Sequence, residues 1–202
     1  MNIAAAAMLG SLVLALFALR SEEKSFDTAL NTASAGAAVF TVTAGISGFF
    51  TFMAAFNPQL SAEREFGEQL GRFLLQLPLG QSWLITTIMG SVITVLAFAW
   101  RTWTPTLITA ILAAASFLPL ATQGHSGELA GHNIAVNSIL LHTIGAAVWL
   151  GGLLLVVILR DRSGVGTARL VSRYSSLAIA AFAVVAISGL ARSIVSLSLI
   201  HI

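Results

Sequence analysis

The sequence has no cysteine in 202 residues, and only 9% of its residues are Asp, Glu, Lys or Arg. Without cysteine the chain cannot form a disulfide, a CxxC redox motif or a thiolate metal site, so any bound metal must use His, Met, carboxylate or backbone oxygen. A soluble domain typically carries about 25% charged residues. Ten basic and eight acidic residues cannot make a chain of this length soluble. We therefore expect lipid to surround most of it.

Motifs for chemistry on soluble substrates are also missing. The sequence contains no P-loop, no GxSxG and no HExxH, and no Ser–His–Asp set can be assembled from it, so we expect no enzyme activity. The formal net charge is only +2, and no basic stretch is long enough to follow a phosphate backbone. Nucleic acid is therefore not an expected partner.

Apolar residues make up 57% of the chain and gather in six stretches. A bilayer core of about 30 Å takes about 20 apolar residues as a helix, and these stretches do not alternate polar and apolar residues as barrel strands do. The sequence predicts an all-α polytopic transmembrane bundle of about six spans, folded as one domain over residues 1–202. The stretches are Ile3–Leu19, Thr32–Phe56, Leu79–Trp100, Thr104–Thr122, Ile134–Leu159 and Ser175–Ile200.

Basic residues predict the orientation, because Lys and Arg concentrate in cytoplasmic loops. The 160–174 segment contains four arginines, which predicts a cytoplasmic basic loop. Counting back through the spans places the 57–80 and 122–133 segments and the N-terminus outside. Because the chain ends abruptly after His201, we also expect it to continue in a longer protein.

The 57–80 segment has a pattern of its own. Phe66, Phe73 and Leu77 fall on one helical face, whereas most charged residues fall elsewhere. We expect an amphipathic helix on the outer interface, with Ser61 as its N-cap. A connector without function is the simpler alternative.

Two ionisable residues fall at membrane depth, where charge is costly and often functional. His142 lies about two turns into the fifth stretch, on one face with Gly145 and Trp149. A neutral imidazole binds copper, zinc or haem iron, but a hydrogen bond from His142 to a Ser or Thr of another helix is the simpler alternative. Arg192 lies in the outer part of the sixth stretch, where it either reaches the headgroups or pairs with an anion such as Glu128 or a haem propionate.

Further candidate metal ligands lie toward the same side. The predicted outer loop before the fifth stretch holds His125, Glu128 and His132, which could also be ordinary polar loop residues. Met53 and Met89 lie in the predicted outer half, as do Met1 and Met8. Thioethers suit Cu(I), although methionine is also a common core filler, and Met1 is simply the first residue.

Five stretches together resemble the bacterial copper-resistance D (CopD) family. They are GHSGELAGH at 124–132, LHTIGAAVWLGGL at 141–153, LPLGQSWL at 77–84, and RYSSLA at 173–178 with ISGLAR at 187–192. The resemblance extends over roughly residues 35–195. In some relatives a CopD-like half is fused to a CtaG-like cytochrome oxidase assembly half. This chain would be the N-terminal part of such a fusion.

The resemblance implies a multi-pass protein of the bacterial plasma membrane that takes up copper or confers copper resistance. His125, His132 and His142 match the histidines of the family pattern, and copper would pass from the outer two to His142. A periplasmic copper-binding protein or cytochrome oxidase assembly proteins are the expected partners. Two alternatives stay open: a b-type haem protein for electron transfer, and an assembly factor that delivers copper without transport.

Overall fold

The structure, a computed structural model, describes residues 1–61, 63–123, 132–160 and 167–200. These residues are helical wherever they form regular structure, with no strand among them, so the all-α prediction is confirmed. Helix is the expected outcome, since a chain in hydrocarbon must satisfy its own backbone hydrogen bonds. The helices are α1 (Asn2–Ala18), α2 (Lys24–Phe56), α3 (Arg64–Gln76), α4 (Pro78–Ala99), α5 (Trp103–Ala115), α6 (Leu118–Ala121), α7 (His132–Leu159) and α8 (Thr167–Ile200).

All six predicted apolar stretches are helical over most of the residues that the structure describes; the fourth is interrupted by a turn at Ser116 and Phe117. Five segments are long and apolar enough to cross a membrane, and α5 and α6 count among them as one segment, Trp103–Ala121. Helix α1 is equally apolar but has 17 residues, or about 25 Å at 1.5 Å per residue. The chain is therefore a polytopic membrane protein, whereas the outside location of its N-terminus stays a prediction.

Two helices begin earlier in the chain than the apolar stretches. Helix α2 begins at Lys24 rather than near Thr32, and α8 begins at Thr167. Residues 167–174 of the predicted basic loop thus form the first turns of α8. A hydropathy window detects only the part of a helix that lipid surrounds, so it misses helical turns that carry polar residues beyond that part.

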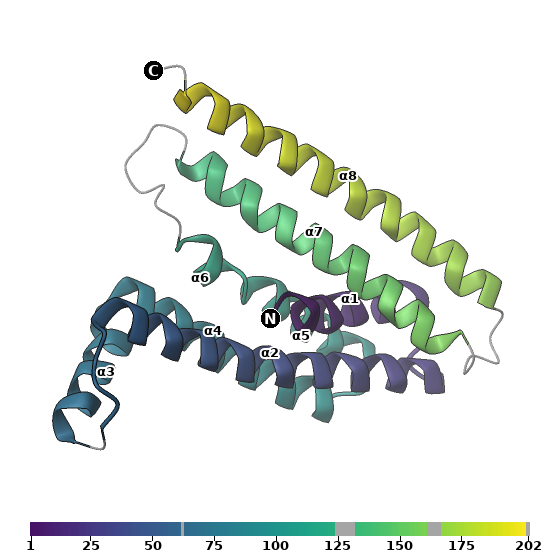
Figure 1. The fold of residues 1–202 in the computed structure, drawn as a ribbon. Coiled ribbons are helices and arrows are strands. Elements are labelled where there is room, and N and C mark those ends of the chain that lie inside the picture. Colours follow the sequence, from purple (N-terminus) through teal and green to yellow (C-terminus); the bar gives the residue numbers. More distant parts are fainter. Residues whose placement is uncertain (62, 124–131, 161–166, 201–202) are drawn as a thin grey trace.

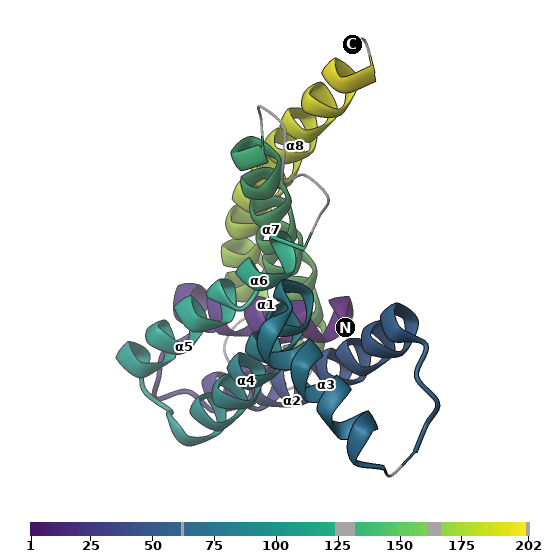
Figure 2. The same cartoon turned by 90° about the vertical axis from the view of Figure 1, so that its left-hand side faces the viewer.

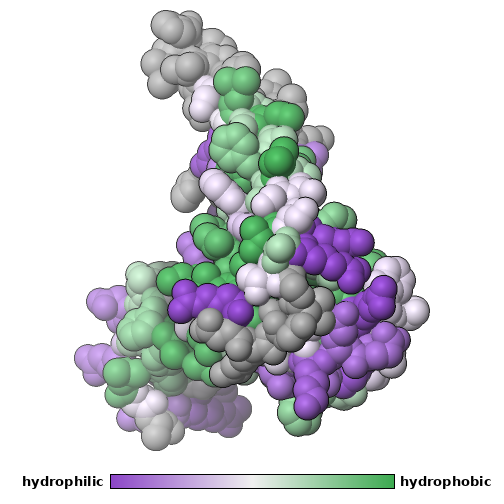
Figure 3. Space-filling model, turned by 90° about the vertical axis from the view of Figure 1, so that its right-hand side faces the viewer, coloured by the Kyte–Doolittle hydropathy of each residue, from purple (hydrophilic) through white to green (hydrophobic). Residues whose placement is uncertain are grey.

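The long helices run back and forth between two ends of the bundle (Figure 1). At one end, here called the Lys24 end, α1 and α4 finish and α2 and α8 begin; at the other, the His132 end, α2 finishes and α4 and α7 begin. Figure 3 faces the Lys24 end and shows hydrophilic residues gathered there. Helices α7 and α8 form an antiparallel pair that rises from the other helices (Figure 2), and α8 contacts mainly α7.

Helix α1 lies at the centre, packed on α2 and α7. The hydrophobic effect does not drive helices together inside a bilayer, so they associate mainly where small residues let their backbones approach closely. A Cβ at Gly10 would lie 2.5 Å from the backbone of Gly151 in α7, and a Cβ at Gly36 would lie 2.7 Å from the Met8 nitrogen. Glycines thus set both helix crossings.

Helix α3 packs on the end of α2 through aromatic rings. Phe52 contacts Phe66 and Phe73 at 5.6 Å between ring centroids, and Phe73 is buried. The N-cap is Glu63 rather than the predicted Ser61, because the Ser61 hydroxyl accepts the Glu63 N–H at 3.3 Å before the helix begins at Arg64. The outer-interface location of the 57–80 segment stays a prediction.

The crossing of α1 and α7 gives a direct test of the fold. We expect Gly151→Ala to lower the stability of the purified protein by about 1–3 kcal/mol, because the new methyl group would overlap the Ala6 carbonyl. The matched control is Gly71→Ala in α3, where a Cβ meets nothing within 4 Å and the change should be neutral or stabilising. Thermal unfolding in detergent measures both, and an equal effect of the two changes would contradict the assigned crossing.

Candidate metal and ion site around His142

His142 lies in α7, facing α8, and its ring is held by the backbone of that helix. Nδ1 lies 3.2 Å from the Val185 carbonyl oxygen and 3.5 Å from the Ser188 hydroxyl oxygen. The Ser188 hydroxyl itself donates to the Val184 carbonyl at 2.6 Å. Gly189 leaves room for the ring, because a Cβ there would lie 3.8 Å from Nδ1.

The bond to Val185 fixes which ring nitrogen carries the proton. A carbonyl oxygen only accepts, so the bond requires the proton on Nδ1 in a neutral imidazole. Nε2 then carries a free lone pair. A histidine whose second nitrogen donates to a carbonyl is the usual arrangement around a metal-binding imidazole, because that bond orients the ring. The predicted alternative, a bond to Ser or Thr of another helix, is present as the longer 3.5 Å contact of Nδ1 with the Ser188 hydroxyl, beside the bond to the Val185 carbonyl. Both contacts use Nδ1 and leave Nε2 available.

Two cavities meet at His142. One, of about 300 Å³, lies between α7, the start of α1, α2 and α6, and its lining includes Met1, Asn2, Thr143 and Phe40 beside His142. The cavity thus combines an imidazole and a thioether with mostly apolar walls. The second cavity, of about 330 Å³, lies between α7 and α8 and includes Arg192.

The other predicted ligands do not join His142 in the described residues. Met53 in α2 and Met89 in α4 are half-buried and line neither cavity, and Met8 is fully buried in the core. Met1, which the sequence offered no reason to select, is the methionine that reaches the His142 cavity. No sequence pattern shows that Met1 lies near His142, since that proximity depends on how α1 lies against α7.

The predicted outer ligands fall largely outside the described residues. His125 and Glu128 belong to the 124–131 segment, which the structure does not describe. His132 is the first residue of α7, and its side chain is likewise not described. Their grouping with His142 stays a prediction.

Trp149, two turns after His142, has a packing role in the structure. Its ring contacts Phe182 of α8 at 5.6 Å, edge to face, and its carbonyl accepts the Tyr174 hydroxyl at 3.1 Å. Trp149 lines neither His142 cavity. It therefore helps to hold α8 in the position that orients His142.

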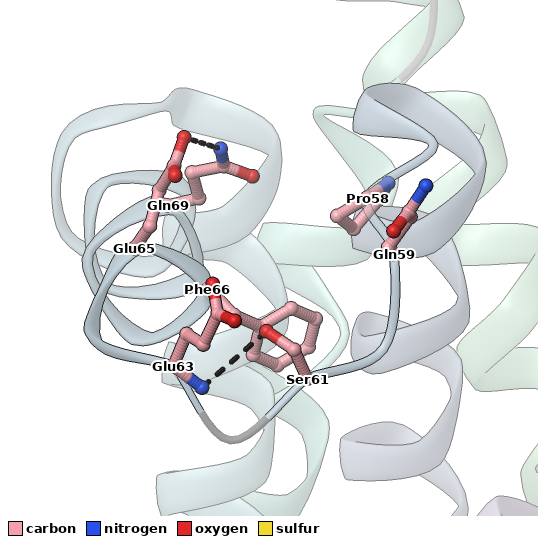
Figure 4. Close-up of a pocket in the computed structure, with 7 residues that line it drawn as sticks. All are labelled: Pro58, Gln59, Ser61, Glu63, Glu65, Phe66 and Gln69. Carbon is pink, nitrogen blue, oxygen red and sulfur yellow. Dashed lines mark hydrogen bonds between the residues drawn. The ribbon is translucent and has the colours of Figure 1, made fainter.

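A third cavity, of about 300 Å³, lies between the end of α2 and α3 (Figure 4). Two glutamates line it, and Gln69 donates to the Glu65 carboxylate at 3.4 Å. It contains no imidazole or thioether, and the described residues form no group of three or more His, Asp or Glu side chains that could hold a metal. The cavity around His142 therefore fits a soft metal better.

A family model described as copper resistance protein D-like, N-terminal domain, matches residues 1–135 of the 202. The chain belongs to the copper resistance protein D-like family. No curated protein and no solved structure matches it. The match confirms the family resemblance, but it ends before His142, so the role of His142 in this copper resistance protein D-like chain depends on geometry.

The tautomer of His142 can be measured directly. We expect ¹⁵N spectra of the histidine-labelled, metal-free protein near neutral pH to show a protonated Nδ1 and an unprotonated Nε2 for this ring, because Val185 accepts from Nδ1. The spectrum of His142→Gln identifies the signals by their loss. A proton on Nε2 of the neutral ring would contradict the assigned geometry.

Proposed function

We propose that this membrane protein takes up copper, or handles it for copper resistance, with His142 as the ligand inside the bundle. Family membership supports a copper-related membrane function. The observation that carries the assignment to His142 is the bond from Nδ1 to the Val185 carbonyl, which leaves Nε2 without the proton, and His142 lines a cavity together with Met1. We propose the bacterial plasma membrane as the location.

The donor set favours Cu(I) as the substrate. Thioethers are soft ligands that select Cu(I), and imidazole binds copper well. Structural zinc sites take four protein ligands, whereas this cavity offers the described side chains of one histidine and one methionine. A site with few ligands holds an ion weakly enough for the ion to leave again. The site therefore suits transport of copper better than its storage.

We propose that copper reaches His142 from the predicted outer loop. His125 and His132, with Glu128, would collect the ion there, and a periplasmic copper-binding protein is the candidate donor. Since the sequence contains no nucleotide-binding loop, the ion would move down its gradient or by exchange between ligands, without an enzymatic step. Delivery to cytochrome oxidase assembly proteins is the alternative destination.

The haem alternative requires a second axial ligand. The side chains of the other three histidines, His125, His132 and His201, lie outside the described residues, so a second histidine ligand for haem stays a prediction. An absorption spectrum of the purified protein separates the two proposals, because a bis-histidine haem gives a strong Soret band.

Three substitutions of His142 test the copper proposal. We expect His142→Ala and His142→Gln to reduce copper uptake by cells expressing the full protein by about tenfold or more, because both remove the imidazole. His142→Met should retain part of it, since a thioether also binds Cu(I). Copper accumulation per cell, corrected for the amount of protein in the membrane, is the measurement.

His142→Gln is the decisive control. Its amide N–H can still donate to the Val185 carbonyl, so it preserves a helix–helix hydrogen bond but not a metal ligand. If His142→Gln retained uptake while His142→Ala lost it, the histidine would have only a packing role. Unchanged uptake in all three variants would also refute the assignment.

A further inference from the structure

The second cavity beside His142 contains a positive charge that copper binding does not explain. It lies between α7 and α8 and is lined by Ile139, His142, Thr143, Ser188, Gly189 and Arg192. Arg192 is one turn beyond Ser188 in an otherwise apolar stretch of α8. A cation in this place repels a copper ion bound to His142, so the arginine needs its own explanation.

Arg192 has no carboxylate partner among the described residues. The sequences of α7 and α8 contain no Asp or Glu, and the described ion pairs are Arg64–Glu68 and Arg101–Asp27. Glu128, the partner suggested from the sequence, lies outside the described residues. The Arg192 side chain is exposed on the surface of the chain, and a charge on a membrane helix is costly unless an opposite charge or water meets it.

The position of Arg192 along α8 indicates where such a charge would come from. Arg173 donates to the Phe17 carbonyl at 3.0 Å, at the Lys24 end of the bundle. Arg192 follows it by about 28 Å of helix at 1.5 Å per residue, close to the thickness of about 30 Å of the hydrocarbon core. Arg192 therefore lies near the opposite boundary, within reach of lipid phosphates and of dissolved anions.

We propose that the α7–α8 cavity binds an oxyanion of the phosphate type through the guanidinium of Arg192. Arginine presents its N–H groups in a planar fork that matches two phosphate oxygens. The hydroxyls of Ser188 and Thr143 already donate to carbonyls of their own helices, so the guanidinium is the principal donor. The oxyanion is either the phosphate group of a phospholipid or free inorganic phosphate.

The anion would also change the electrostatics of the neighbouring His142. With Arg192 alone, the cavity has a positive charge; with an oxyanion bound, that charge is neutralised or reversed, which favours a cation on the imidazole. This consequence rests on the proposed copper function. Binding of the oxyanion does not, so the test below uses metal-free protein.

The test measures phosphate and phospholipid binding to the purified full chain in detergent. Titration calorimetry follows inorganic phosphate, and native mass spectrometry follows retention of an added phosphatidylglycerol. We expect Arg192→Gln to weaken binding by about tenfold or more, as for loss of a charge-assisted bond, and Arg192→Lys to weaken it less. Arg169→Gln, which removes the same charge at the far end of α8, should leave binding unchanged.

The two arms distinguish the source of the oxyanion. Retention of the phospholipid without phosphate binding identifies the headgroup, and the reverse result identifies the free ion. Absence of both from the unmodified protein, or an equal loss in Arg169→Gln, overturns the proposal. Binding that appears only in Glu128→Gln also overturns it, since Glu128 would then be the partner of Arg192.

Discussion

The close crossing of α1 and α7 is the contact on which the His142 cavity depends. Gly10 and Gly151 bring the two backbones together so closely that no side chain fits between them. Because the start of α1 forms one wall of the cavity and α7 carries His142, this crossing determines how near Met1 and Asn2 lie to the imidazole. In lipid, such a contact depends on shape and van der Waals packing, since apolar side chains gain little by leaving one apolar medium for another.

The sequence predicted the helices well and their ends less well. Hydropathy identifies apolar helices because the bilayer leaves the backbone no partners except its own groups, and each of the six stretches is helical over most of its described residues. The same signal fails where lipid is absent. Lys24 and Thr167 begin helices whose first turns are polar, and no hydropathy window distinguishes such turns from a loop. Ser61 was a reasonable N-cap by residue type, but the N-cap of α3 is Glu63, whose N–H donates to the serine hydroxyl.

The candidate site was only partly predictable, because it depends on contacts between helices. A single ionisable residue in an apolar helix was sufficient to select His142 in one stretch and Arg192 in another, and the structure places both in the lining of one cavity. The methionines show the limit. Sequence offers four thioethers at similar predicted depth, and only the packing of α1 reveals that Met1 reaches the cavity while Met53 and Met89 do not. The carbonyl of Val185 could not have been predicted at all, because every residue has one.

Packing and metal binding were posed as alternatives for His142, but the structure makes them compatible. An imidazole has two nitrogens, and the bond to Val185 occupies one of them. That bond restricts ring rotation, so less entropy is lost when the other nitrogen binds an ion, and the proton is already on the nitrogen that does not bind it. His142 also lines two cavities, one together with Met1 and the other together with Arg192. In the proposed copper site, a cation at His142 would therefore have a soft donor near it and the Arg192 charge near it as well, and an oxyanion in the Arg192 cavity would decide whether that charge opposes the cation.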